Sequence, residues 1–192
     1  MKTALNYQNL SDVELLAELI GVRESRLLYQ GSLKPLFAAS PEKGVSHQKC
    51  AVAKELVRRL LEEELQNGNA LTSPSAVRDY LKLLLNQQEH EIFVVIFLDA
   101  QNRVIATEEM FRGTLTQTSV YPREVVKAVL RHNAAAVILA HNHPSGVPEP
   151  SLSDRLLTDT LKQALSLIDV RVLDHFIVAG TETVSLAELG LM

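Results

Sequence analysis

The sequence contains a single cysteine, Cys50, and no tryptophan among its 192 residues. One cysteine cannot form an internal disulfide, so the sequence does not belong to the small secreted proteins held together by disulfides, and a reducing compartment is favoured. The amino terminus lacks the continuous apolar core of a signal peptide, and no run reaches the roughly 18 apolar residues that a transmembrane helix needs. We therefore expect a cytoplasmic protein with no membrane association.

The sequence also lacks a strong excess of charge of either sign. It has 19 Lys and Arg against 23 Asp and Glu, a formal net charge of −4, so we expect no global attraction to nucleic acid, although a local basic patch would escape this count. Hydrophobic residues make up 46% of the chain, which is enough to build a core at this length. Composition therefore predicts one globular domain with a small appendage.

The first 70 residues have the pattern of a small all-helical module. Leu10-Ser11-Asp12, followed by apolar residues at helical spacing, predicts a capped helix that ends at Gly21. A longer amphipathic helix is predicted over residues 47–65. The short polar segment 66–70 is the predicted linker, so we divide the chain into a helical module with linker, 1–70, and a second domain, 71–192.

The second domain has the alternating pattern of a mixed α/β fold. Residues 91–99 are dense in β-branched and aromatic side chains, which predicts a central strand buried on both faces. The segment Asp99–Asn102 predicts a tight turn into a second strand over 103–107. Helices are predicted at 73–86, 123–132 and 151–167, and further strands at 134–140, 170–180 and 183–185.

The most informative segment joins a buried strand to a helix through a loop rich in proline. His141 and His143 follow the apolar residues 134–140, and their imidazoles can point the same way because alternate side chains of a strand share a face. A helix that begins near Ser151 carries Asp154 in its first turn. The intervening loop can bring this carboxylate back towards the two histidines.

The spacing His-x-His, seven residues, Ser, two residues, Asp offers three ligands to one metal ion. Two imidazoles and a carboxylate leave one position of a tetrahedral zinc ion open, which is where a catalytic site holds water. A hydrolase also needs a general base and a donor to the developing oxyanion. Ser151 suits the second task, but Ser-x-x-Asp is equally a helix-capping pattern, and the serine can serve both purposes.

Spacing alone does not identify the general base. Four glutamates are candidates: Glu91 at the start of the first strand, Glu108 and Glu109 after the second strand, and Glu149 in the loop. Asp174 and His175 lie in a later strand, where an isolated histidine is more often structural. Three other histidines lack ligand spacing and are interpreted as surface residues: His47, His90 and His132.

The combination His141-x-His143, Ser151 and Asp154 resembles the motif of the JAMM (MPN-type) metalloproteins. The residues that fill it, Asn142, 144–146 and 148–150, resemble the bacterial RadC-like branch of that family. The similarity spans roughly residues 73–180 and includes the segments 97–99, 111–114, 121–124 and 172–175. It implies a JAMM/cytidine-deaminase-like mixed sheet flanked by helices.

This resemblance also implies roles for the site residues. By its analogy His141, His143 and Asp154 bind Zn²⁺, the glutamate at the start of an early strand activates the water, and Ser151 stabilises the intermediate. The strand that follows Glu91 resembles the family strand led by that glutamate, with Glu89 as the nearby rival on the same strand face. We therefore expect a zinc metallohydrolase of the peptidase or isopeptidase kind, with a peptide or protein substrate.

An alternative function follows from residues 1–70, which resemble the helical region that precedes RadC-like domains. In those relatives a glycine-rich helix-hairpin-helix turn holds DNA phosphates. The corresponding turn here, 44–49, lacks a second glycine, and the segment 20–29 is short; both departures count against DNA binding. The alternative is thus a DNA-repair or mobile-element accessory protein that binds DNA or a protein partner with little or no hydrolysis.

Two further alternatives are a metal-dependent nuclease and a zinc-holding interaction module. The string His141-Asn142-His143 has the letters of a nuclease motif, but the nucleases named for them spread those residues over a much longer segment. A zinc-holding interaction module without turnover would have the same ligands as the hydrolase. Nothing in the sequence indicates the oligomeric state.

Overall fold

The computed structural model describes residues 7–68, 70, 74–86, 88–113 and 120–192. The chain divides into two compact units, Met1–Arg59 and Leu60–Met192. The boundary expected from the sequence, between residues 70 and 71, stays a prediction. Asn69 of the predicted linker, residue 73 at the start of the predicted helix 73–86 and residue 114 of the segment 111–114 lie outside the described residues.

The first unit is helical, as predicted. Ser11 caps its first helix by accepting a hydrogen bond from the Glu14 amide, and the Glu14 side chain bonds back to the Ser11 amide, which satisfies two otherwise unpaired donors. Gly21 ends this helix with φ of 101°. The buried core contains Leu16, Ile20, Leu36 and Cys50. The elements are η1 (Tyr7–Asn9), α1 (Asp12–Ile20), α2 (Val22–Leu28), α3 (Lys34–Ala38), η2 (Pro41–Lys43) and α4 (Val45–Asn67), whose last residues belong to the second unit.

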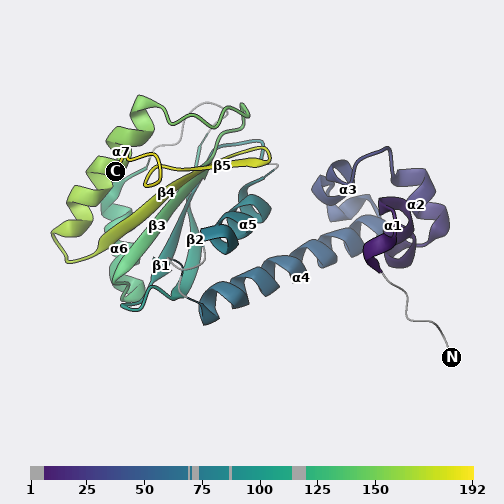
Figure 1. Cartoon of the computed structure of the whole chain (residues 1–192), viewed down its shortest axis with the longest axis horizontal. Coiled ribbons are helices and arrows are strands. Elements are labelled where there is room, and N and C mark those ends of the chain that lie inside the picture. Colours follow the sequence, from purple (N-terminus) through teal and green to yellow (C-terminus); the bar gives the residue numbers. More distant parts are fainter. Residues whose placement is uncertain (1–6, 69, 71–73, 87, 114–119) are drawn as a thin grey trace. The chain divides into compact units, whose positions relative to one another are not determined.

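The second unit is a three-layer α/β structure, which confirms the predicted fold class. A five-stranded sheet of order β2-β1-β3-β4-β5 is covered by α5 on one face and by α6 and α7 on the other (Figure 1). Its elements are α5 (Pro74–Leu85), β1 (Ile92–Leu98), β2 (Val104–Arg112), α6 (Pro122–His132), β3 (Ala136–Asn142), α7 (Leu152–Ser166), β4 (Arg171–Ala179) and β5 (Glu182–Ser185).

Strand β3 lies at the centre of the sheet, antiparallel to β1 and parallel to β4. All seven residues of β1 and all seven of β3 are buried, because helices cover both faces. This explains why neither strand alternates apolar and polar residues. The crossover from β3 to β4 is α7, so the start of α7 lies just beyond the end of β3, and the site residues of both elements can meet there.

Alternate residues of the strands build two separate cores. Ile92, Val94 and Ile138 pack on the α5 side, whereas Phe93, Val95 and Leu139 pack against α6 and α7. His141 has the same parity as Leu139 and therefore faces the α6 and α7 side. The sheet thus directs this histidine towards the helix that carries Asp154.

Two strand boundaries differ from the sequence prediction. β2 continues to Arg112 instead of ending near Thr107, because it stays paired with β1 across a register shift between Phe93 and Val94; Glu108 and Glu109 therefore lie within this strand. β3 begins at Ala136 and includes His141. Within the described part of the chain, none of the helices combines the length and the apolar character needed to cross a bilayer.

Candidate metal centre

Three potential metal ligands converge where β3 ends and α7 begins. His141 is the second-last residue of β3, and His143 directly follows that strand. Asp154 is in the first turn of α7. One donor atom from each residue lies within 4.8 Å of the other two. The structure therefore brings together the three residues that spacing singled out, and this group could hold a metal ion.

The separations of the donor atoms fit a small tetrahedral cation. The Nε2 atoms of His141 and His143 are 3.0 Å apart, His141 Nε2 is 3.2 Å from Asp154 Oδ1, and His143 Nε2 is 3.6 Å from Asp154 Oδ2. Ligands that each bind tetrahedral zinc at about 2.0–2.1 Å are about 3.3 Å from one another. The donor set, two imidazoles and a carboxylate, is also one that zinc prefers.

The loop after β3 orients His143. Its Nδ1 lies 2.6 Å from the carbonyl oxygen of Val147, and because a carbonyl only accepts, Nδ1 must carry the proton. In the neutral ring Nε2 is then a free lone pair, directed at His141 and Asp154. Only the protonated ring can donate from Nε2 to Asp154; this interaction chiefly raises the pKa of His143, and the negative charge of Glu91 adds to it.

Asp154 is almost completely covered, with 9% of its surface exposed. Burial by itself opposes ionisation, but the adjacent imidazoles of His141 and His143, which can carry positive charge, outweigh it and hold the pKa of this carboxyl well below its usual value. Its Oδ2 also accepts hydrogen bonds from the amide and the hydroxyl of Ser151, at 2.7 and 2.6 Å. The side chain is therefore a charged carboxylate in a fixed orientation.

Ser151 forms the helix cap that the sequence left as an alternative. Its hydroxyl accepts from the Asp154 amide at 3.2 Å and completes a capping box at the start of α7. The residue is exposed, and its hydroxyl lies next to the carboxylate of Asp154. The capping interpretation is confirmed, and the expected role as oxyanion donor stays a prediction.

Glu91 lies beside this cluster. Phe93 is opposite His141 in the antiparallel pairing of β1 and β3. Glu91, two residues before Phe93, is therefore across from His143, two residues after His141. It also lies on the same face of the sheet as Phe93 and His141. At this position its negative charge contributes to raising the pKa of His143. Glu91 is partly buried, and its carbonyl accepts from the amide of Gly113 at 2.8 Å.

Asn142 fixes the backbone on both sides of Glu91. Its Oδ1 accepts from the amide of Ile92 at 2.7 Å, and its Nδ2 donates to the carbonyl of His90 at 2.9 Å. These bonds replace backbone pairing at the place where β1 begins. In the sequence, Asn142 is recognisable only as part of the pattern that resembles the RadC-like branch. Its place between His141 and His143 is the one local signal of this role.

The other glutamate candidates are arranged differently. Glu89 and Glu149 are exposed, and so is Glu109, which lies within β2. Glu108 is 2.5 Å from Arg131 and 2.7 Å from His132. Burial would raise the pKa of Glu108, but the bonds and charges of these partners lower it overall.

His132 is not the surface residue that the sequence suggested. Its side chain is 20% exposed, and its ring lies 4.5 Å from that of Phe97, measured between centroids. Its position in the last turn of α6 brings it over the middle of β2, where Glu108 is its partner. The absence of a second potential ligand at a suitable spacing argues against metal binding by His132. It says nothing about whether the side chain is buried against other residues.

Sequence reasoning left His175 undecided, and the structure places it directly behind the centre. Its Nε2 lies 2.9 Å from His141 Nδ1, and its Nδ1 lies 2.6 Å from the hydroxyl of Thr158 on α7. His175 is 0% exposed. Burial, followed by the neighbouring charge of His141, holds the pKa of His175 well below its usual value. The ring of Phe93 packs against both His141 and His175.

Asp174, by contrast, has structural contacts. Its Oδ1 accepts from the amides of His175 and Ala187, and its Oδ2 accepts from the Ser185 hydroxyl at 2.6 Å. These bonds tie β4 to β5 and to the turn after it. Thr158 was missed by sequence reasoning, although its position four residues after Asp154 places both on one helix face.

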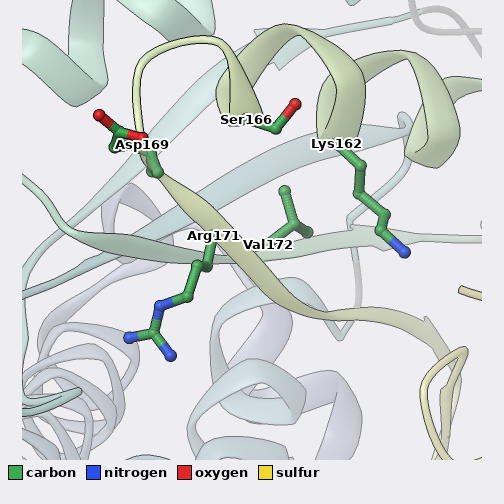
Figure 2. Close-up of a pocket in the computed structure, with 6 residues that line it drawn as sticks. Lys162, Ser166, Asp169, Arg171 and Val172 are labelled. Atoms are coloured by element: carbon green, nitrogen blue, oxygen red, sulfur yellow. The ribbon is translucent and has the colours of Figure 1, made fainter.

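A separate pocket lies at the far end of α7 and contains none of the cluster. It is lined by Lys162, Ser166 and residues 169–172. The charged ends of Lys162 and Arg171 extend to opposite sides of it (Figure 2), and the Arg171 guanidinium donates to Asn102 Oδ1 at 3.0 Å. The two cations therefore do not converge on a common ligand position.

Comparison with known proteins agrees with these features. The family model described as the RadC-like JAB domain matches residues 71–191. A UPF0758 protein of Thiobacillus denitrificans is 62% identical over 156 residues, which cover 80% of this chain and 70% of that protein. A UPF0758 protein of Herminiimonas arsenicoxydans is 55% identical over 199 residues, which cover 94% and 89%.

A third relative, a UPF0758 protein of Nitrosospira multiformis, is 67% identical over 138 residues, which cover 72% of this chain and 62% of that protein. The names of these relatives state no activity. The matched region contains the whole sheet and all three potential ligands, and the mixed sheet with helices on both faces is consistent with a JAB-like fold. The resemblance inferred from the motif is thus confirmed: the chain belongs to the RadC-like JAB domain family.

Proposed function

We propose that the chain is a zinc-dependent metallohydrolase of the peptidase or isopeptidase kind. The observation that carries this proposal is the convergence of His141, His143 and Asp154 with donor atoms 3.0–3.6 Å apart. Nε2 of His143 is an unprotonated lone pair in the neutral ring, and the nearby Asp154 is a carboxylate. Electron-rich atoms this close favour a cation between them.

Zinc held by these three residues would supply a bound water whose pKa falls from ~16 towards ~7. The protein residues supply the rest of the chemistry. Glu91 is the proposed general base: it takes a proton from the attacking water and passes it to the leaving amine. Ser151 is the proposed donor to the oxyanion, and its exposure at the start of α7 supports this role.

The position of Glu91 supports its assignment over the rival glutamates. It lies on the same face of the sheet as His141, its backbone is fixed by Gly113 and Asn142, and its charge acts on His143. Glu108 is engaged by Arg131 and His132 instead. A base with a fixed backbone loses little entropy when it reaches the reactive geometry.

The experiment compares Glu91→Gln with Glu89→Gln on a peptide library, with bound zinc measured in the same samples. Glu91→Gln should keep its zinc and lose at least about a hundredfold in turnover, the lower end of the general-base contribution. Glu89→Gln, an exposed neighbour two residues away, should behave as the wild type. Undiminished hydrolysis by Glu91→Gln would remove this residue from the mechanism.

The competing proposal is an accessory role in which the protein binds DNA or a protein partner with little or no hydrolysis. Its support is the turn before α4, where Gly44 has φ of 135° and the first amides of a long helix follow, a common site for phosphates. DNA binding that weakens steeply with added salt would favour it. No DNA binding at low ionic strength, together with turnover of a peptide, would favour the hydrolase.

A further inference from the structure

A buried chain of hydrogen bonds leads away from the metal centre through three elements. It runs from His141 on β3 to His175 on β4, with 2.9 Å between Nδ1 and Nε2, and on to Thr158 on α7, with 2.6 Å between Nδ1 and Oγ1. His175 and Thr158 are both 0% exposed, and His141 is 1% exposed. Water therefore does not compete for these bonds.

The last link determines the direction of the whole chain. The Thr158 hydroxyl lies 2.6 Å from the carbonyl oxygen of Asp154, and a carbonyl oxygen can only accept. The single hydroxyl proton is therefore committed to Asp154, the usual bond of a helical threonine to the carbonyl four residues before it. Towards His175 the hydroxyl oxygen can only accept, so Nδ1 of His175 carries a proton.

The same reasoning continues to His141. A neutral imidazole has one proton, and in His175 it is on Nδ1, so Nε2 accepts from Nδ1 of His141. Complete burial favours the neutral form of His175. With its own proton on Nδ1, His141 presents an unprotonated Nε2, the atom that faces His143 and Asp154.

We propose that His175 is a positioning residue that holds His141 in the tautomer required for metal binding, and that Thr158 sets the direction of this chain. The inference rests on the proposed metal site. Metal-binding histidines commonly donate their second N–H to a fixed acceptor, and loss of that acceptor typically costs about 10–100-fold in metal affinity. Here the acceptor is the neutral ring of His175, which adds no negative charge behind His141. Of the three proposed ligands, Asp154 alone is negatively charged.

The orientation of His141 also depends on this contact. The ring planes of His141 and His175 are inclined by 57° with centroids 4.9 Å apart, and Phe93 packs on both rings. Stacking on the ring of Phe93 restrains the plane of the His141 ring but does not distinguish its two orientations related by a 180° flip about the Cβ–Cγ bond. The hydrogen bond to His175 selects one of them. The pair of contacts thus determines where Nε2 points before any ion binds.

The direct test is the assignment of histidine tautomers in the metal-free protein by long-range ¹H–¹⁵N correlation NMR. The proposal predicts protonated Nδ1 and unprotonated Nε2 in both His141 and His175. A protonated Nε2 in His141 with a bare Nδ1 would overturn it, because His175 would then be the donor. Since no ion is needed, this result judges His175 separately from the proposed metal site.

The second test uses matched substitutions and the zinc affinity measured by competition with a chelator. Thr158→Val should lower affinity about tenfold, by allowing the His175 ring to reverse its donor. Thr160→Val is the control, because Thr160 is exposed and makes the same kind of bond, 2.8 Å to the Leu156 carbonyl. Equal affinities of these two variants would contradict the role of Thr158.

Substitutions of His175 complete the series. His175→Phe removes the acceptor and should lower affinity about 10–100-fold, whereas His175→Gln offers an amide oxygen to His141 and an N–H to Thr158 and should recover most of that loss. Equal affinity of His175→Phe and the wild type would overturn the proposal. If the buried phenyl ring prevents folding of His175→Phe, the tautomer assignment by NMR and the zinc affinity of Thr158→Val still test the proposed role of His175. A wild type without zinc affinity would instead overturn the proposed metal site.

Discussion

Nδ1 of His143 donates to the carbonyl oxygen of Val147 across 2.6 Å. This bond spans the proline loop and leaves Nε2 of the same ring directed at the other two ligands. Gly146, just before Val147, has φ of 78°, a conformation that costs other residues about 1–2 kcal/mol. The glycine thus permits the turn that brings the carbonyl to His143.

Gly146→Ala should therefore weaken metal binding severalfold and lower the free energy of unfolding by about 1–2 kcal/mol. Gly180→Ala is the control, because Gly180 also has positive φ, 61°, and open space around it, but lies in the turn between β4 and β5. It should lose similar stability and keep its zinc affinity. Isothermal titration and urea unfolding measure the two quantities; equal zinc affinities would disprove the coupling.

Asn142→Ala should lower turnover without removing the metal. The substitution leaves the Ile92 amide and the His90 carbonyl without their partner, which costs about 1–3 kcal/mol in unfolding free energy and loosens the backbone on both sides of Glu91. Elemental analysis and peptide hydrolysis are measured on the same sample. Full turnover in a destabilised variant would show that Asn142 does not position the base.

Ser151→Ala separates capping from catalysis when it is compared with Ser11→Ala. Both serines form the same capping box, Ser11 with Glu14 and Ser151 with Asp154, so each substitution should cost about 1 kcal/mol of stability. Only Ser151→Ala should reduce turnover, by about 100-fold or more if it removes an oxyanion donor. Equal turnover of the two variants would leave Ser151 a cap alone.

The contact of Glu108 with Arg131 and His132 should contribute to stability in a pH-dependent way. The pKa of Glu108 in the folded protein lies below its usual value of 4.5. Its contribution, ~1 kcal/mol for a partly exposed pair, is therefore fully present above about pH 4.5 and is lost as the pH falls through the lower folded-state pKa.

Urea unfolding of the wild type and of Glu108→Gln at pH 7, 5 and 3 measures this contribution. The two proteins should differ at the upper pH values and converge at the lowest. Glu109→Gln, an exposed neighbour on β2, provides the control and should match the wild type throughout. A difference between wild type and Glu108→Gln that persists unchanged at pH 3 would contradict the assignment.

The sequence predicted that His141, His143 and Asp154 lie close together, because local structure places each of them. His141 and His143 share a strand face, and Asp154 follows from the start of a helix, so only one loop had to bring them together. The mixed sheet was predictable for the same reason: β1 and β3 are short apolar runs with clear stops.

The residues behind the cluster depend on distant pairing. His175 meets His141 because β4 lies parallel to β3, and no local pattern gives that register. Glu91 approaches His143 through the pairing of β1 with β3, which is why spacing left four glutamates open. Glu108 likewise found its partners on α6 only once β2 extended past its predicted end.

The most direct test of the account is the bound metal of the wild type beside His141→Ala and Asp154→Ala, with His47→Ala as a control from the first unit. Purified proteins are loaded with zinc, dialysed, and analysed for metal and folded content. The account predicts about one zinc per chain in the wild type and in His47→Ala, and little in the two ligand variants. Equal zinc in all four folded proteins would contradict the site.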